Sequence, residues 1–144
     1  MDFKEIQQWG KNLGQEINDL SKVDAEKLVE VAMKVGGYLA RRSPDNPEKD
    51  PIDLKINQIR RFLDGARRIE SDIKAKSFDD VKDSIVLLRP KLAYAAGREQ
   101  KVKPLMNVLD PAIKSGAVSK ENFDKLLRLI EGIIAYHRFY GGTN

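Results

Sequence analysis

Apolar side chains recur at steps of three and four residues along nearly the whole chain, the spacing of one helix face. No segment of useful length shows the two-residue alternation of a β-strand. The pattern therefore predicts an all-α fold, a bundle of five or six helices. The length of 144 residues fits a single domain over 1–144.

Start and stop signals divide this pattern into elements. Residues 1–24 form a predicted N-terminal helix, which Gly10 and Gly14 weaken by about 1 kcal/mol each relative to alanine. A second helix begins near Asp24, a favourable N-cap residue. Residues 43–51 contain three prolines and form a predicted loop.

The remaining helices follow from similar signals. Asp50 before Pro51 predicts the start of a third helix, whose apolar stripe runs from Ile52 through Ile73. Ser77 predicts the start of a fourth, which Pro90 should kink or end before helix resumes to about Arg98. Two more helices are expected over 102–116 and 119–140, the last of which ends at a glycine pair.

Composition excludes several classes of protein. The absence of cysteine excludes disulfide scaffolds, thiol nucleophiles and cysteine-ligated zinc. No apolar run reaches the roughly 18 residues of a membrane-spanning helix, and the N-terminus lacks the apolar core of a signal peptide. We therefore expect a cytoplasmic protein with no membrane partner.

Positive charge is concentrated in the middle of the chain. Residues 38–103 carry 16 basic and 11 acidic side chains, whereas residues 1–37 carry 5 and 7. This middle region is a candidate anion-binding surface, although a solvated surface of mixed charge remains an alternative.

The third helix carries the densest cations. Arg60, Arg67 and Lys74 recur every seven residues and so share one helix face, with Arg61 and Arg68 in a second row beside them. Phosphate binding is one interpretation. The other is salt-bridged decoration of the surface, since Asp64 and Asp72 lie four residues after Arg60 and Arg68.

A second cationic group surrounds the proline. Arg89, Lys91 and Arg98 would join the third-helix cations in one strip if the two helices were antiparallel neighbours. Such a strip would follow a nucleic-acid backbone without reading bases. Tyr94 could stack on a base or sugar, or could pack between helices.

Candidate catalytic chemistry is sparse. The one histidine, His137, lies on an apolar stripe, where a packing or hydrogen-bonding role is more common than catalysis. Asp79, Asp80 and Asp83 occupy the first turns of a predicted helix, where the helix dipole favours negative charge, although a metal site is an alternative. We expect no catalytic residues, no metal and no cofactor.

Three segments carry a family resemblance. INQIRRFLDGA, LLRPKLAYAAGR and the terminal EGIIAYHRFYGG resemble, in order and separation, motifs of the small subunit of type III-A CRISPR (Csm) interference complexes. The resemblance covers roughly residues 25–142, and its motifs lie at Ile59–Phe62, Pro90–Arg98 and Ala135–Gly141. The first 24 residues match no such motif.

The resemblance implies a function and partners. Family members are non-catalytic helical proteins of a ribonucleoprotein, which stack head to tail and line the groove holding CRISPR RNA paired with target RNA. The implied partners are these two RNAs, further copies of the chain, the backbone subunit and the large polymerase-like subunit. Tyr136 and His137 fall in the terminal motif and are interpreted as packing or subunit-contact residues. The positions carried over as RNA-binding residues are Lys55, Arg60, Arg61, Arg67, Lys91 and Arg98.

Two other functions remain alternatives. A helical DNA-binding or regulatory protein would place a basic helix in a major groove, but the chain lacks a compact helix-turn-helix spacing. A metal-dependent nuclease would use Asp79, Asp80 and Asp83, but no second carboxylate group is evidently placed with them.

Overall fold

The computed structural model describes residues 3–40 and 52–144, and within them every regular element is helical. The predicted 43–51 loop and the predicted cap at Asp50 lie outside the described residues. The all-α prediction is confirmed. The α-helices are α1 (Phe3–Glu16), α2 (Ala25–Leu39), α3 (Arg60–Ala75), α4 (Phe78–Val86), α5 (Leu88–Arg98), α6 (Lys103–Gly116) and α7 (Lys120–Phe139).

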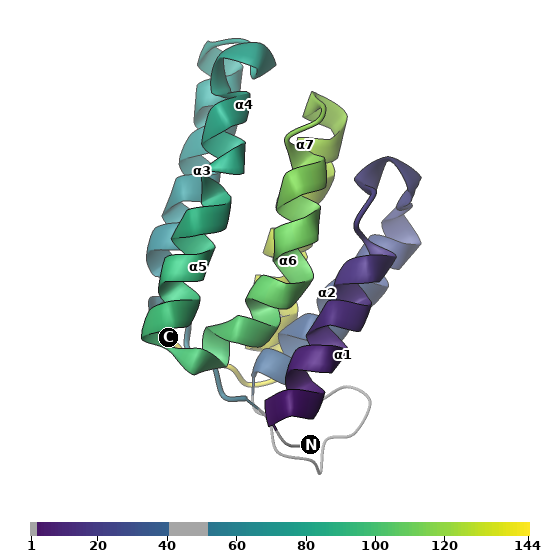
Figure 1. Ribbon diagram of the computed structural model, residues 1–144, viewed down its shortest axis with the longest axis vertical. Helices are drawn as coiled ribbons and strands as arrows, with labels where there is room; N and C mark the ends of the chain where they lie inside the picture. The colour runs from purple at the N-terminus through teal and green to yellow at the C-terminus, as the bar shows by residue number, and fades with distance from the viewer. Residues whose placement is uncertain (1–2, 41–51) are drawn as a thin grey trace.

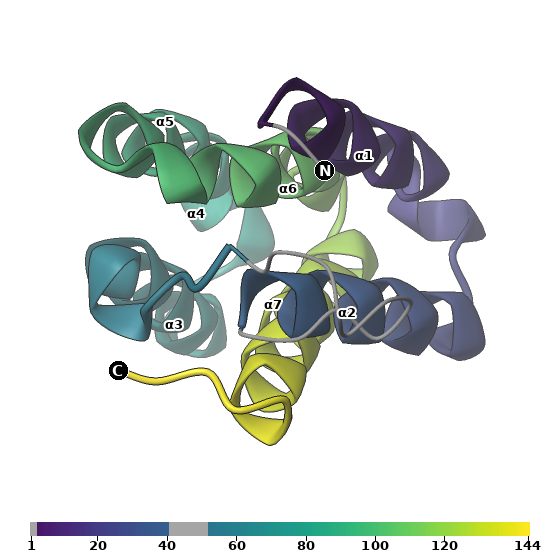
Figure 2. The same cartoon turned by 90° about the horizontal axis from the view of Figure 1, so that it is seen from below.

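Successive helices run in alternating directions, except that α4 and α5 follow one another along the same rod (Figure 1). Seen from below, α1, α6 and α5 form one layer and α2, α7 and α3 form the other (Figure 2). The tightest pairings are α2 with α7 and α1 with α6, while α5 contacts both α6 and α3. One apolar cluster runs through all seven helices.

The predicted helix starts are largely confirmed. The side chains of Asp24, Ser77 and Ser119 each accept a hydrogen bond from a backbone N–H in the first turn of α2, α4 and α7. Each bond satisfies one of the N–H groups that a helix start leaves without a partner. At the other end of α7, Gly141 has a φ of 92°, the left-handed conformation that favours glycine.

The prediction of a third helix from Ile52 is wrong. Residues 52–55 are not helical, and after a single 3-10 turn (Ile56–Gln58) the helix begins at Arg60. The N–H groups of Ile52, Asp53 and Leu54 donate to the carbonyls of Tyr38, Ala40 and Leu39 (3.3, 3.0 and 2.7 Å). These bonds satisfy the last carbonyls of α2. Residues 52–54 therefore form a connection that closes the end of α2, and they are not the first turn of a new helix.

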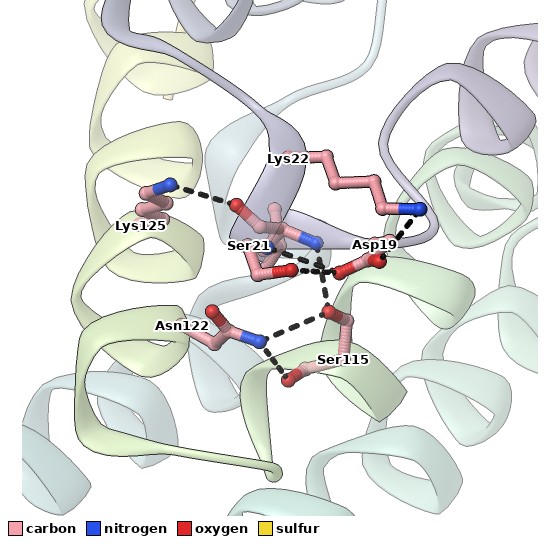
Figure 3. A network of polar contacts seen from close by, with 7 residues as sticks. Asp19, Ser21, Lys22, Ser115, Asn122 and Lys125 are labelled. Carbon is pink, nitrogen blue, oxygen red and sulfur yellow. Dashed lines mark hydrogen bonds and ion pairs between the residues drawn. The ribbon is translucent and has the colours of Figure 1, made fainter.

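The predicted N-terminal helix over 1–24 is also too long. Helix α1 ends at Glu16, and Leu20–Lys22 form a separate 3-10 turn. Two polar side chains hold this turn, the buried Ser115 of α6 and the half-buried Lys125 of α7 (Figure 3). Ser115 Oγ accepts from the N–H of Leu20 at 2.9 Å, and Lys125 Nζ donates to the carbonyls of Leu20 and Val23, both at 2.8 Å. The backbone groups released by the break therefore find partners on α6 and α7.

Glycines allow the closest helix contacts. A Cβ at Gly14 of α1 would lie 2.6 Å from the Asn107 carbonyl oxygen of α6, and one at Gly36 of α2 would lie 2.5 Å from the Ile133 carbonyl oxygen of α7. Neither distance is sterically possible, and the obstacle in each case is backbone. The glycines that weaken α1 in isolation therefore permit the packing that stabilises the fold.

We predict that Gly36→Ala lowers the free energy of unfolding by about 1–3 kcal/mol, because the added methyl forces α2 away from α7. Gly97→Ala is the matched control, since Gly97 also lies in a helix and a Cβ there meets nothing within 4 Å. The control should leave stability unchanged or raise it by up to about 1 kcal/mol. Chemical denaturation of both variants measures the difference, and equal stabilities would contradict the close-packing account.

Candidate nucleic-acid interface

Helices α3 and α5 lie side by side and run in opposite directions (Figures 1 and 2). This is the antiparallel arrangement that was needed for the two cationic groups to join in one strip. Each helix buries its apolar face and leaves its charged face exposed. The buried side chains are Phe62, Leu63, Ala66 and Ile69 on α3, with Leu88, Leu92 and Ala96 on α5.

A groove of about 580 Å³ follows the line where the start of α3 meets the end of α5. We call it the basic groove. Four of the six predicted RNA-binding residues line it, namely Arg60 and Arg61 from α3 and Lys91 and Arg98 from α5. All four side chains are exposed. The other lining residues are Asn57, Gln58, Ile59, Phe62, Asp64, Tyr94, Ala95 and Glu99.

A second groove, the upper groove, continues from the first toward α4. The two share Arg61, Asp64 and Lys91, and the upper groove adds Arg68 from α3. Together they form one furrow between α3 and the α4–α5 rod. Its remaining lining residues are Gly65, Ile69, Asp72, Ser84 and Leu87.

Gly65 gives Lys91 its place between the two grooves. A Cβ at Gly65 would lie 3.3 Å from Lys91 Nζ and 3.7 Å from its Cδ, so the lysine stem lies directly over this glycine. The ammonium group is thereby held at the centre of the furrow. A larger residue at position 65 would displace it.

Four cations of the furrow are not neutralised by any acid among the described residues. Within the described part of the chain, Arg60, Arg61, Arg68 and Lys91 form no ion pair, so the possible partners Asp64 and Asp72 do not bind them. The alternative interpretation, in which these cations only form surface ion pairs with acids of the same helix, is therefore wrong. Their charge remains available to an external anion.

The acid at the end of the basic groove is held by hydrogen bonds. Glu99 accepts from Gln58 Nε2 at 3.1 Å through one oxygen and from the Lys101 N–H at 3.2 Å through the other. The Gln58 side-chain oxygen in turn accepts from the Lys55 N–H at 2.8 Å. This chain of contacts joins the start of α3 to the end of α5 at one end of the groove.

Tyr94 lies on the groove and does not pack between helices. Its side chain is 61% exposed, and the Arg98 guanidinium carbon lies 5.9 Å from its ring centroid. This separation is within the range of a cation–π interaction. The interpretation of Tyr94 as a helix-packing residue is therefore wrong.

Three predicted cations lie elsewhere. Lys55 precedes the helix and contacts Asp53 at 3.9 Å and the Thr143 hydroxyl at 3.4 Å, and Arg67 is exposed outside both grooves. Arg89 does not join the cationic group. It forms a two-point ion pair with Asp110 of α6 at 2.8 and 3.0 Å, and this carboxylate raises the pKa of Arg89 above its usual value.

Sequence reasoning omitted Arg68 from the binding residues. It lies seven positions after Arg61, and this second row faces α4 and α5. The heptad spacing could have identified it once the partner helix was known. Of the first row, Arg60 lines the basic groove and Arg67 lines neither groove.

The residues considered for catalysis or metal binding lie in a buried helix contact and at a helix start. His137 is 2% exposed and its Nε2 lies 2.6 Å from the Leu54 carbonyl oxygen, which confirms its packing and hydrogen-bonding role. Asp79 and Asp80 occupy the first turn of α4. Across residues 3–40 and 52–144, no three histidine or acidic side chains are grouped as a metal site. Among the helices of the same residues, none has an apolar stretch of membrane-spanning length.

Comparison with known proteins agrees with the motif resemblance. The family model described as Csm2 Type III-A matches residues 22–143. This chain belongs to that family. A protein named CRISPR system Cms protein Csm2, from Streptococcus thermophilus, is 33% identical over 94 residues, which cover 63% of this chain and 76% of that protein.

Membership of the Csm2 family identifies the chain as a small subunit of a type III-A Csm complex. The match includes α3, α5 and α7, and therefore both sides of the basic groove. All of α1 (Phe3–Glu16) lies before the matched residues.

Proposed function

We propose that this Csm2-family chain is a non-catalytic RNA-contacting subunit, which binds the backbone of the guide and target RNA through the basic groove. The observation that carries the proposal is the convergence of Arg60, Arg61, Lys91 and Arg98 from two helices onto one groove. Three of these cations make no contact with an acid or a ring within the described residues, and Arg98 contacts Tyr94.

The chemistry of the groove suits a phosphate backbone. Exposed guanidinium and ammonium groups bind phosphates without reading bases, and their affinity depends on salt. Sequence-independent contact is what a subunit needs when the guide supplies specificity by base pairing. CRISPR RNA and target RNA are therefore the proposed nucleic-acid partners, in the cytoplasm.

The rival function, a helix that reads a DNA major groove, finds less support. Arg61 and Arg68 face α4 and α5 across the furrow. A recognition helix must project into a groove roughly 12 Å wide, whereas one side of this basic face is already lined by a second helix.

Assembly with further copies and with the backbone and large subunits forms the second part of the proposal. Val118 precedes α7 and is 74% exposed, and Phe139 ends α7 and is 76% exposed. The two lie at opposite ends of a 20-residue helix, which spans about 30 Å. Apolar side chains at opposite ends suit head-to-tail stacking, in which unlike surfaces meet.

Replacing Arg60, Arg61, Lys91 and Arg98 together with alanine should weaken binding of target RNA by the reconstituted complex. Each lost phosphate contact should also reduce the slope of log affinity against log salt by about 0.7–0.9. Measuring affinity over a range of salt concentrations tests both effects. The fold should persist, because all four side chains are exposed.

The matched control removes four exposed lysines outside the furrow, Lys4, Lys11, Lys82 and Lys120. It changes the net charge by the same amount and should leave the slope close to that of the natural chain. If both variants reduce the slope equally, net charge and not the basic groove determines binding, and the proposal fails.

Phe139→Ser should reduce the number of copies in each complex, because the exposed ring is proposed to contact the next copy. Native mass spectrometry of the reconstituted complex counts the copies. Val29→Ser is the control, since Val29 is an exposed apolar residue (48%) in the second turn of α2. An unchanged copy number for Phe139→Ser would contradict this mode of stacking.

A further inference from the structure

The basic groove contains more than a phosphate site requires. A row of cations alone binds a backbone, but here the cations surround an exposed aromatic ring, Tyr94, and an exposed amide, Asn57. From this combination we infer that the groove holds an unpaired nucleotide, with its base stacked on Tyr94 and its phosphate on the cations of α3 and α5. The inference rests on the proposed RNA-binding function and extends it.

The ring of Tyr94 is available for stacking. Within the described residues its only ring contact is with Arg98, and its hydroxyl has no hydrogen-bond partner. A tyrosine with 61% of its surface exposed contributes little to the core. Arg98, one helical turn further along α5, orients the ring and adds a planar guanidinium to the platform.

The surroundings separate phosphate from base. Arg60, Arg61 and Lys91 carry positive charge on the α3 side and at the centre of the furrow. Glu99, held by Gln58 and Lys101 where the end of α5 meets the start of α3, disfavours a phosphate next to it. The backbone is therefore placed over the cations, and the base is directed toward Tyr94.

Asn57 supplies a side-chain amide that can form hydrogen bonds with any of the four bases. Its backbone N–H bonds the carbonyl of Asn144, but its exposed side-chain amide has no partner within the described residues. An amide both donates and accepts, so it can meet the edge of any base. The Gln58 amide cannot serve here, because both its ends are engaged.

The ligand must be unpaired because a duplex hides its base faces. In an A-form helix each base is covered by its neighbours, and a protein meets phosphates, 2′-hydroxyls and base edges. A tyrosine gains stacking energy only from a base that has left the stack or belongs to a single strand. The groove volume of about 580 Å³ lies within the range of small-ligand sites.

The test compares an oligouridylate with an abasic ribose-phosphate oligomer of equal length, which has the same charges but no bases. The natural chain should bind the oligouridylate about 5- to 100-fold more tightly. Tyr94→Ala should abolish this preference while leaving abasic binding and the salt slope unchanged. Tyr94→Phe should retain the preference, because the ring remains.

Further arms separate the sources of the nucleotide. Binding to a fully paired duplex should not change in Tyr94→Ala, and a deoxyuridylate oligomer tells whether the ribose contributes in addition to the base. The inference is overturned if the natural chain binds both oligomers equally, or if Tyr94→Ala keeps the preference. The proposed phosphate function would survive that result, because it depends on the slope lost with Arg60, Arg61, Lys91 and Arg98.

Discussion

Burial of the apolar face of α3 is the constraint on which the interface depends. Phe62, Leu63 and Ile69 are each at most 5% exposed, and burying such side chains contributes about 1.5–3 kcal/mol each. A surface ion pair on the same helix contributes only a few tenths of a kcal/mol. Burial of this apolar face therefore determines which side of α3 faces the core. The cations of α3 lie on the solvent side whether or not an acid lies nearby.

The break between α4 and α5 sets the other side of the furrow. The N–H of Leu87 closes α4 on the Asp83 and Ile85 carbonyls, and Pro90 falls in the first turn of α5, where its missing N–H costs little. Arg89 then ties α5 to α6 through Asp110. The charge of Arg89 therefore stabilises the packing of α5 on α6, while the charges of Lys91 and Arg98 remain at the surface for an anion.

Periodicity predicted the helices well because most apolar residues face one core. It failed at Ile52–Lys55, whose apolar residues also contact the core although their backbone donors close the end of α2. The sequence also could not show which cations are paired. Arg89 and Arg61 look equivalent along the chain, and only the position of Asp110 on a distant helix separates them. Tyr94 remained open for the same reason, since its exposure depends on how α3 and α5 pack.

RNA is proposed to lie along the furrow between α3 and α5. Photo-crosslinking of the assembled Csm complex, with thiouridine in the guide or target strand, tests it directly, because crosslinked peptides report which surface meets RNA. We predict crosslinks within residues 57–68 and 91–99, including Tyr94. Crosslinks confined to α1 or α7, with none on α3 or α5, would contradict it.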